Sequence, residues 1–368
     1  MKTETEKKQT HLSKSVRQIK PSGIRKFFDL ASQMEGVISL GVGEPDFITP
    51  WNVCEASLNA LEHGYTGYTA NAGLLELREE ISAYLQKRFR LHYEPNDEIL
   101  VTVGASQAID LALRTIIDPD DEVLIVEPCF VAYAATVTLA GGVPISIGTS
   151  AETEFKLLPE QLEEHVTERT KAIIVCFPNN PTGTTMTKEE LEALTYIIKK
   201  HDLIVLSDEI YAELSYDDEH TSIAELKGMK DRTIYISGFS KAFAMTGWRL
   251  GYVAGPREII QAMLKIHQYT MMCAPTMAQY GALEALRNGL DDVSNMVKSY
   301  RQRRNFLVQS FQEIGLDCLM PGGAFYVFPS IQRTGLTSEQ FAEKLLHEEK
   351  VAVVPGQVFG KGGEGHIR

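Results

Sequence analysis

The chain has 368 residues, of which 44% are hydrophobic and 23% are charged, and its 36 Lys and Arg against 49 Asp and Glu give a formal net charge of −13 at pH 7. This composition excludes a mainly disordered chain. The acidity argues against nucleic acid or an anionic membrane as the main partner, because both favour basic protein surfaces. The length predicts about two domains.

The cysteines and the N-terminal segment bear on the compartment. Five scattered cysteines without a C-x-x-C pair indicate reduced thiols, and predict neither a disulfide framework nor a metal site. No apolar run approaches the roughly 20 residues of a membrane span. The N-terminus, MKTETEKKQTHLSKS, lacks the apolar stretch of a signal peptide. We therefore expect a cytoplasmic protein without a membrane partner.

The N-terminal part contains few strong signals. The first 20 or so residues are polar and are expected to form an arm. A helical pattern covers about residues 24–34. The segment ISLGVGEPDF (38–47) predicts a short strand that ends at Gly and Pro.

From residue 98 onward, strand and helix patterns alternate. The strand patterns are nearly continuous runs of Val, Ile and Leu, which is typical of strands buried on both faces of a parallel sheet. The alternation predicts an α/β fold whose mostly parallel sheet lies between layers of helices. The predicted strands are 98–104, 121–128, 143–148, 171–178, 203–209 and 233–240, and the predicted helices are 105–117, 130–142, 157–166 and 188–202.

After residue 255 the pattern changes. Helices are predicted over 257–269, 276–289 and 338–349, and one long amphipathic helix over about 292–314. GAFYVFPS (323–330) and VAVVPG (351–356) predict short strands. This part suggests a smaller α+β domain. We expect an arm at 1–45 that contributes to the small domain, a large domain at 46–285 and a C-terminal small domain at 286–368.

Polar residues follow the ends of the predicted strands. In an open α/β sheet, ligands bind beyond the carboxyl ends of the strands, so these residues are expected to converge at one edge. The segments are GASQ (104–107), EPCF (127–130), PNNPTG (178–183), SDEIY (207–211), SGFSK (237–241) and TGWR (246–249).

The groups in this set fit one cofactor. A helix N-terminus with small residues, a Ser and an Arg can hold a phosphate. A lysine at a strand end can form a Schiff base when burial and nearby positive charge favour its neutral amine. An aspartate on a buried strand can pair with a protonated ring nitrogen. Together these are the requirements of pyridoxal 5'-phosphate.

The motifs also carry a family resemblance over about residues 24–368. ISLGVGEPDF, YTGYTANAGLLELR, VTVGASQAID, PNNPTG, SDEIYAEL, SGFSKAFAMTGWRLGY and GEGHIR occur in this order. The chain resembles the fold-type I pyridoxal-phosphate aminotransferases of class I and II. SGIRKF, KIHQY and GAFYVFPS further resemble the bacillar aminotransferase A branch, which is associated with N-acetyl-LL-diaminopimelate transamination in lysine synthesis.

The resemblance implies roles for individual residues. Lys241 is the expected Schiff-base lysine and proton carrier, and Asp208 the expected partner of the pyridinium nitrogen. Tyr211 and Asn180 would hydrogen-bond the ring oxygen. The other implied cofactor contacts are Phe130 on the ring face, Gly104, Ala105, Ser106, Gln107, Ser240 and Arg249, and Tyr68 of the neighbouring subunit. The implied substrate contacts are Gly41, Asn180 and Arg368, with Arg368 on the α-carboxylate.

Taken singly, these residues have structural alternatives. Asp208 could cap a helix that begins at Glu209, and GASQA could form an ordinary turn. Arg249 could form a surface ion pair, although its position at the start of RLGYVAG, before a strand, favours a buried place. Phe130 stands where many relatives have Tyr or Trp, so stacking is retained but a hydroxyl role is not. Tyr68 could serve only in packing.

The implied activity is a ping-pong transfer of an amino group between an L-amino acid and a 2-oxo acid such as 2-oxoglutarate. The donor could be N-acetyl-LL-diaminopimelate. The alternatives are an aspartate or aromatic aminotransferase, or a pyridoxal-phosphate-dependent C–S β-lyase on the same fold. A homodimer with shared active sites is expected. Relatives continue beyond the position of Arg368 with a strand and a helix, so the small domain is expected to be incomplete in this sequence.

Overall fold

The computed structural model describes residues 11–21, 23 and 34–368. Most of the helix expected over residues 24–34 lies outside the described residues. Within the expected polar arm the structure has a short helix, α1 (Lys14–Gln18). The side chain of Ser13 caps it by accepting a hydrogen bond from the Val16 N–H at 3.4 Å.

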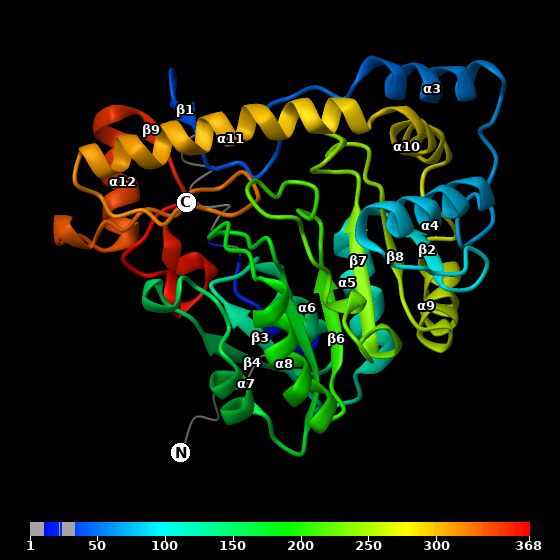
Figure 1. Ribbon diagram of the computed structural model, residues 1–368, viewed down its shortest axis with the longest axis horizontal. Coiled ribbons are helices and arrows are strands. Elements are labelled where there is room, and N and C mark those ends of the chain that lie inside the picture. Colours follow the sequence, from blue (N-terminus) through cyan, green and yellow to red (C-terminus); the bar gives the residue numbers. More distant parts are fainter. Residues whose placement is uncertain (1–10, 22, 24–33) are drawn as a thin grey trace, which may run out of the picture.

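A seven-stranded sheet forms the centre of the molecule (Figure 1). Neighbouring strands are parallel, except that β8 runs antiparallel to both β2 and β7. The mostly parallel α/β sheet predicted from the sequence is therefore confirmed. In spatial order the strands are β2 (Ile99–Thr102), β8 (Gly251–Ala254), β7 (Thr233–Gly238), β6 (Ile204–Asp208), β5 (Thr170–Val175), β3 (Glu122–Glu127) and β4 (Val143–Gly148).

Alternating side chains of the central strands enter two different hydrophobic clusters. In β3, Val123 and Ile125 belong to one cluster, and Leu124 and Val126 belong to the other. Both faces are therefore buried, which explains the continuous apolar runs. β4 departs from this expectation because it is an edge strand, and several of its residues are exposed.

Helices cover both faces of the sheet (Figure 1). Burial of their apolar stripes against the strands holds the layers together, at about 25 cal/mol per Å² of apolar surface. Helices α5 (Gly104–Ile116), α6 (Ala132–Leu139) and α9 (Arg257–Thr270) contribute to the first cluster. Helices α7 (Pro159–His165) and α8 (Lys188–Lys200) contribute to the second cluster.

Two further helices lie in a part of the chain for which the sequence patterns predicted no helix. They are α3 (Trp51–Glu62) and α4 (Leu75–Phe89), and both contact α10 (Thr276–Asn288). In α4, Leu77, Ile81 and Leu85 are fully buried and recur at every fourth position. That spacing is a helical signal, and it could have predicted α4.

The C-terminal part is built on the long helix α11 (Leu290–Glu313), which crosses the upper side of the molecule in Figure 1. A second, two-stranded sheet pairs β1 (Ile38–Ser39) in parallel with β9 (Val351–Ala352), beside α12 (Ser338–Glu349). The predicted strand at 323–330 is wrong. Its backbone groups form single hydrogen bonds to different segments and no ladder with one strand. For example, the Ala324 N–H donates to Leu214 O and the Ser330 N–H donates to Asp317 O.

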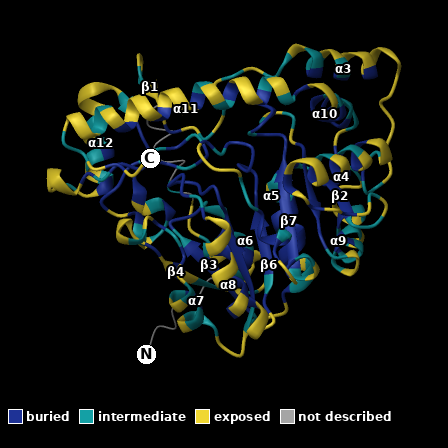
Figure 2. Ribbon diagram, viewed as in Figure 1, coloured by how far each residue is buried: buried dark blue, intermediate teal, exposed yellow. Residues whose placement is uncertain are grey.

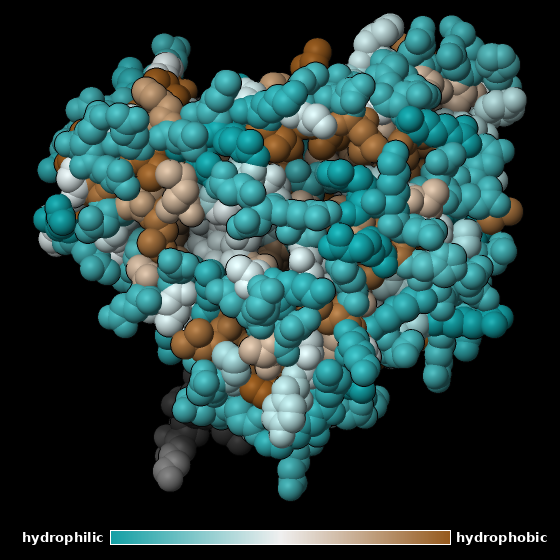
Figure 3. Space-filling view, in the orientation of Figure 1, coloured by the Kyte–Doolittle hydropathy of each residue, from teal (hydrophilic) through white to brown (hydrophobic). Residues whose placement is uncertain are grey.

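Burial follows this layering. The central strands are buried, whereas the outward faces of α3, α4 and α11 are exposed (Figure 2). The face seen in Figure 3 is mainly hydrophilic, with apolar residues in scattered groups. Among the described residues no helix is both long and apolar enough to cross a membrane.

Candidate active site

The carboxyl ends of the parallel strands open into a cavity of about 250 Å³. Asp208 ends β6, Lys241 follows β7, and α5 begins just after β2. The sheet topology therefore brings together segments that lie far apart in the sequence. The predicted site residues that line the cavity are Gly41, Ala105, Ser106, Phe130, Asn180, Asp208, Tyr211, Ser240, Lys241, Arg249 and Arg368.

Lys241 presents its ammonium group to the cavity. Its Nζ donates a hydrogen bond to the Gly43 carbonyl at 2.6 Å. Burial, and then the positive charge of Arg368, lower the pKa of Lys241 to about 8. A pKa near 8 leaves a usable fraction of neutral amine close to neutral pH, which a nucleophile or proton carrier requires.

Asp208 is a buried carboxylate at the floor of the site. Its Oδ2 accepts a hydrogen bond from Tyr133 Oη at 2.6 Å, and its Oδ1 accepts the Ile210 N–H at 3.3 Å. Burial raises the pKa of Asp208 to about 6, while the two hydrogen bonds favour the charged form. No helix begins at Glu209, so Asp208 is not a helix cap. A carboxylate in this setting suits a cationic partner.

The Tyr133 hydroxyl gives a first test of this environment. Because its hydrogen bond favours the ionised form of Asp208, we expect Tyr133→Phe to raise the pKa of Asp208 further above 6. The acid limb of the kcat/KM pH profile should then move to higher pH by about 0.5 to 1 unit. An acid limb at the wild-type position would show that this hydroxyl does not control Asp208.

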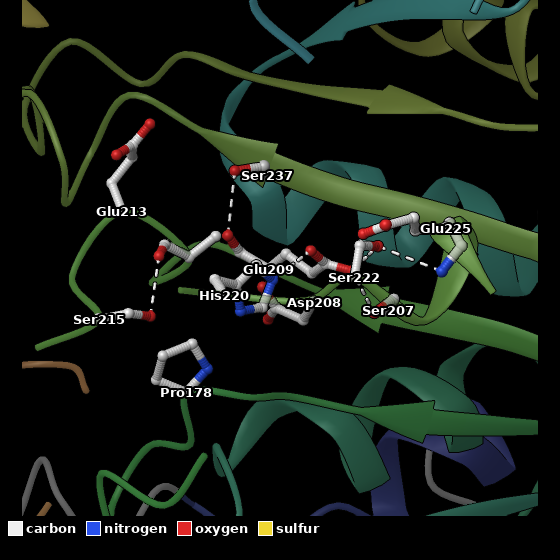
Figure 4. Close-up of polar contacts among 12 residues, drawn as sticks. Pro178, Ser207, Asp208, Glu209, Glu213, Ser215, His220, Ser222, Glu225 and Ser237 are labelled. Carbon is white, nitrogen blue, oxygen red and sulfur yellow. Dashed lines mark hydrogen bonds and ion pairs between the residues drawn. The ribbon is translucent and has the colours of Figure 1, made fainter. Parts of the chain in front are cut away.

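A second carboxylate fixes the chain beside Asp208 (Figure 4). Glu209 is 2% exposed, and its Oε1 accepts hydrogen bonds from Ser207 Oγ at 2.9 Å and Ser222 Oγ at 2.5 Å. Its Oε2 lies 2.7 Å from His220 Nε2. A buried carboxylate with several partners resists displacement, so this cluster holds the end of β6 in place.

The N-terminus of α5 and Arg249 form the other end of the cavity. A Cβ on Gly104, where φ is +78°, would lie 2.6 Å from Arg249 Nη2, so only glycine lets the guanidinium approach the helix end this closely. Free backbone N–H groups and a guanidinium together suit a phosphate. Arg249 itself is exposed, contrary to the buried position expected, because it follows a surface turn and donates to Thr246 O at 3.0 Å.

Gln107 and Gly104 lie outside the residues that line the cavity. Gln107 Oε1 accepts the Val103 N–H at 2.6 Å, and its Nε2 lies 3.1 Å from Nδ1 of the buried His267. The Gln107 side chain is therefore engaged within the protein. The side chain therefore braces the turn that begins α5 and is not free to donate to the cofactor, whereas a contact through the Gln107 backbone stays a prediction.

Arg368 is a second arginine in the lining of the cavity. Its Nη1 donates to Asn180 Oδ1 at 2.7 Å and its Nη2 to Gly41 O at 2.8 Å. The guanidinium carbon also lies 4.5 Å from the centre of the Tyr326 ring. These contacts orient a fork-shaped cation toward the cavity, which suits a carboxylate.

The two aromatic residues expected on the cofactor ring and phosphate, Phe130 and Tyr68, lie in different places. Phe130 lines the cavity and meets Tyr133 edge-on, with ring centres 5.7 Å apart. Tyr68 is 81% exposed and does not line the cavity of its own chain. Its predicted contact is with a neighbouring subunit, so that role stays a prediction.

Several residues of the cavity lining have no role predicted from the sequence. Tyr133 follows Phe130 by three positions, and Tyr326 lies in the GAFYVFPS segment. Both phenols stand in or beside sequence motifs, and this is the signal that points to them as partners of Asp208 and Tyr211. The lining residues without a predicted role are Gly43, Ile109, Tyr133, Cys176, Ile210, Thr246 and Tyr326.

Comparison with known proteins decides the family. The model of the family described as aminotransferase class I and II matches residues 35–368. The chain belongs to this family. It is 66% identical to a putative aminotransferase YugH of Bacillus subtilis, with 98% of this chain and 93% of the relative covered. It is 50% identical to an aspartate aminotransferase of Pyrococcus abyssi, over 95% and 91% of the two chains.

Further matches carry other substrate names. A probable N-acetyl-LL-diaminopimelate aminotransferase of Bacillus subtilis is 44% identical, over 97% of this chain and 90% of the relative. A crystal structure of an aromatic aminotransferase from Pyrococcus horikoshii has a TM-score of 0.89 at 47% identity, over 94% and 92% of the chains. The aminotransferase is thus a transaminase, and the names of its relatives do not agree on a substrate.

Members of this aminotransferase family use pyridoxal phosphate, and the site fits that group. The close approach of Arg249 to Gly104 leaves a helix end suited to a phosphate. The buried Asp208 suits a protonated ring nitrogen, and Lys241 suits an aldehyde. Among the described residues no group of three or more His, Cys, Asp or Glu is placed to hold a metal ion.

Proposed function

We propose that this aminotransferase moves an amino group between an L-amino acid and a 2-oxo acid such as 2-oxoglutarate, by a ping-pong mechanism. The observation that supports the proposal is that Lys241 shares one cavity with two cationic groups, Arg249 and Arg368. Arg249 with the α5 N-terminus suits a phosphate, and Arg368 suits a carboxylate.

The cofactor side would be held by several groups of this chain. Ala105, Ser106 and Arg249 would bind the phosphate, with Ser240 beside them. Asp208 would pair with the ring nitrogen, and Phe130 would lie on the ring face. Tyr211 and Asn180 would donate to the ring oxygen. When bound, pyridoxal phosphate supplies an aldehyde for the amino group and a ring that takes up the electrons of the Cα–H bond.

The substrate side would be set by the carboxylate. Arg368, oriented by Asn180 and Gly41, would grip the α-carboxylate and place the Cα–H bond near Lys241. Lys241 Nζ would then take the proton from Cα and deliver it to the aldehyde carbon of the cofactor, C4′, since its pKa of about 8 lets it act as base and as acid. Ionised Asp208 would keep the ring nitrogen protonated throughout.

For the amino donor we propose three classes. N-acetyl-LL-diaminopimelate, which would place the enzyme in lysine synthesis, is supported by the motif resemblance and by the relative of that name. Aspartate and aromatic amino acids are supported by relatives with those names. The names of the relatives do not agree on one donor, so a donor panel is required.

The panel measures initial rates with 2-oxoglutarate as acceptor. One donor class is expected to exceed the others in kcat/KM by about 100-fold, because a missing side-chain contact costs a few kcal/mol. Glutamate should form in every productive reaction. Release of pyruvate and ammonia from a cysteine conjugate, without any acceptor, would instead identify a C–S β-lyase and overturn the proposal.

We further propose a cytoplasmic homodimer in which Tyr68 of each chain reaches the phosphate site of the other. The 81% exposure of Tyr68 in the single chain supports this placement. We also propose that residues 46–285 form the cofactor domain, and that residues 1–45 and 286–368 contribute to the small domain. The parallel pairing of β1 with β9 joins those two segments.

A further inference from the structure

Tyr326 connects the cofactor side of the cavity to its carboxylate side. Its Oη lies 2.7 Å from Tyr211 Oη, and its ring lies under Arg368 with 4.5 Å from the guanidinium carbon to the ring centre. Tyr326 is 8% exposed. One side chain therefore contacts both the phenol proposed to bind the ring oxygen and the arginine proposed to bind substrate.

Backbone contacts fix the two phenols relative to one another. Ala324 N–H donates to Leu214 O at 2.8 Å, and Tyr216 N–H donates to Gly322 O at 2.9 Å. The segments that follow Tyr211 and precede Tyr326 are thus held side by side, although the phenols are 115 positions apart in the chain. These backbone hydrogen bonds hold the Tyr211 and Tyr326 hydroxyls close to one another.

Besides Tyr211 and Arg368, Gly43 also lies close to Tyr326. A Cβ at Gly43 would lie 2.7 Å from Tyr326 Oη and 3.7 Å from Arg368 Nη2. Only glycine lets this loop come so close, and the same residue accepts the hydrogen bond of Lys241 Nζ through its carbonyl. The Tyr326 hydroxyl is therefore confined between Gly43 and Tyr211.

The direction of the hydrogen bond between Tyr326 and Tyr211 follows from the protons that the two hydroxyls carry. Burial raises the pKa of both Tyr211 and Tyr326, and the titratable groups that face the pair are Arg368 and Cys176. Both hydroxyls therefore stay protonated, and each has one proton to donate. If Tyr211 donates to the cofactor ring oxygen, the bond between the phenols must be donated by Tyr326. A cation over its ring and a second bond in series both strengthen that donation.

We propose that Tyr326 is a positioning residue, whose hydroxyl donates to Tyr211 and directs the Tyr211 proton to the cofactor ring oxygen, while its ring supports Arg368. This rests on the proposed function, in which Tyr211 contacts the cofactor and Arg368 the substrate. The two parts of the side chain therefore have separate effects that two substitutions can distinguish.

The hydroxyl is tested by the pH dependence of the visible absorbance of the protein loaded with pyridoxal phosphate. Tyr326→Phe is expected to raise the midpoint of this titration by about 0.3 to 1 pH unit. Without the Tyr326 hydroxyl, Tyr211 donates less strongly to the cofactor ring oxygen, which then carries more negative charge. The proton on the Lys241 nitrogen beside it is therefore held more tightly. In a Tyr211→Phe background the same substitution should shift the midpoint by less than about 0.2 unit.

Tyr300→Phe is the matched control. Tyr300 is also buried, and its hydroxyl has no hydrogen-bond partner among the described residues. Its removal should leave the midpoint unchanged. Equal midpoints for wild type and Tyr326→Phe, or an equal shift in both Tyr211 backgrounds, would overturn the proposal. A wild type with no visible absorbance would instead overturn the cofactor assignment.

The ring is tested by steady-state kinetics. Tyr326→Phe keeps the ring under Arg368, so the KM for the best amino donor should change by less than about 2-fold. Tyr326→Leu removes the ring and should raise that KM about 10-fold or more, at unchanged circular dichroism. An unchanged KM in folded Tyr326→Leu would show that the ring does not support Arg368.

Discussion

Lys241→Ala is expected to lower kcat by about 10⁴-fold or more and to remove the visible absorbance of the protein after incubation with pyridoxal phosphate. The substitution removes both the amine that would bond the aldehyde and the proton carrier. No other lysine lines the cavity in the described part of the chain. Absorbance spectra and stopped assays with the best donor measure the two effects.

The control for this prediction is Lys230→Ala. Lys230 also carries a positive charge and pairs with Glu98 at 3.4 Å, but it lies away from the cavity. It should retain the wild-type spectrum and kcat within about 2-fold. Wild-type absorbance in Lys241→Ala, or a similar loss in Lys230→Ala, would contradict the role of Lys241.

Asp208→Asn is expected to lower kcat by about 10²- to 10⁴-fold while cofactor binding persists. The amide keeps the shape of the side chain and can still accept the Tyr133 bond, but it cannot stabilise a protonated ring nitrogen. Proton transfer at Cα then loses the electron-withdrawing partner that it requires. A kcat within 5-fold of wild type would refute the pairing of Asp208 with the ring nitrogen.

Asp208→Asn lowers kcat, but we expect it to raise the free energy of unfolding of the cofactor-free protein. In the folded state burial raises the pKa of Asp208 from 3.8 to about 6. As the pH rises from about 4 to 6, the unfolded chain loses this proton first, so ionisation of Asp208 costs the folded state free energy. At neutral pH this cost is about 3 kcal/mol.

We therefore expect cofactor-free Asp208→Asn to be more stable than wild type at pH 7, and the difference to vanish near pH 4. Urea unfolding at both pH values measures it. Asp202→Asn is the control, since Asp202 precedes the same strand but is 90% exposed in its side chain and pairs with Arg232 on the surface. Destabilisation of Asp208→Asn at pH 7 would contradict the burial argument.

Much of the fold could be predicted because the apolar pattern differs between the layers. Continuous runs such as Val123–Val126 are buried on both faces, and their pattern leads directly to the sheet. The elements that the sequence pattern mispredicted or missed have local causes. Residues 323–330 contain a short apolar and aromatic run typical of a strand, yet they find no strand partner and bond to separate segments. Helix α3 became evident only from its packing on α10, whereas the spacing of Leu77, Ile81 and Leu85 could have predicted α4.

The site was predictable to the extent that strand ends converge. Asp208 ends β6, and Lys241 and Arg249 both follow the neighbouring strand β7, so the topology of the sheet was sufficient to place them together. Contacts from outside the strand ends were not predictable in this way. Tyr133 reaches Asp208 from α6, and Tyr326 comes from the irregular segment between α11 and α12. Gln107 faces His267 because of helix packing that no local pattern encodes.

The central claim, amino transfer in two half-reactions, is tested most directly by mixing the loaded protein with the best donor in the absence of an oxo acid. We expect the visible absorbance to fall with release of one equivalent of 2-oxo acid per active site, and added 2-oxoglutarate to restore it with formation of glutamate. Continued product release without an acceptor, or no spectral change with any donor of the panel, would contradict the account.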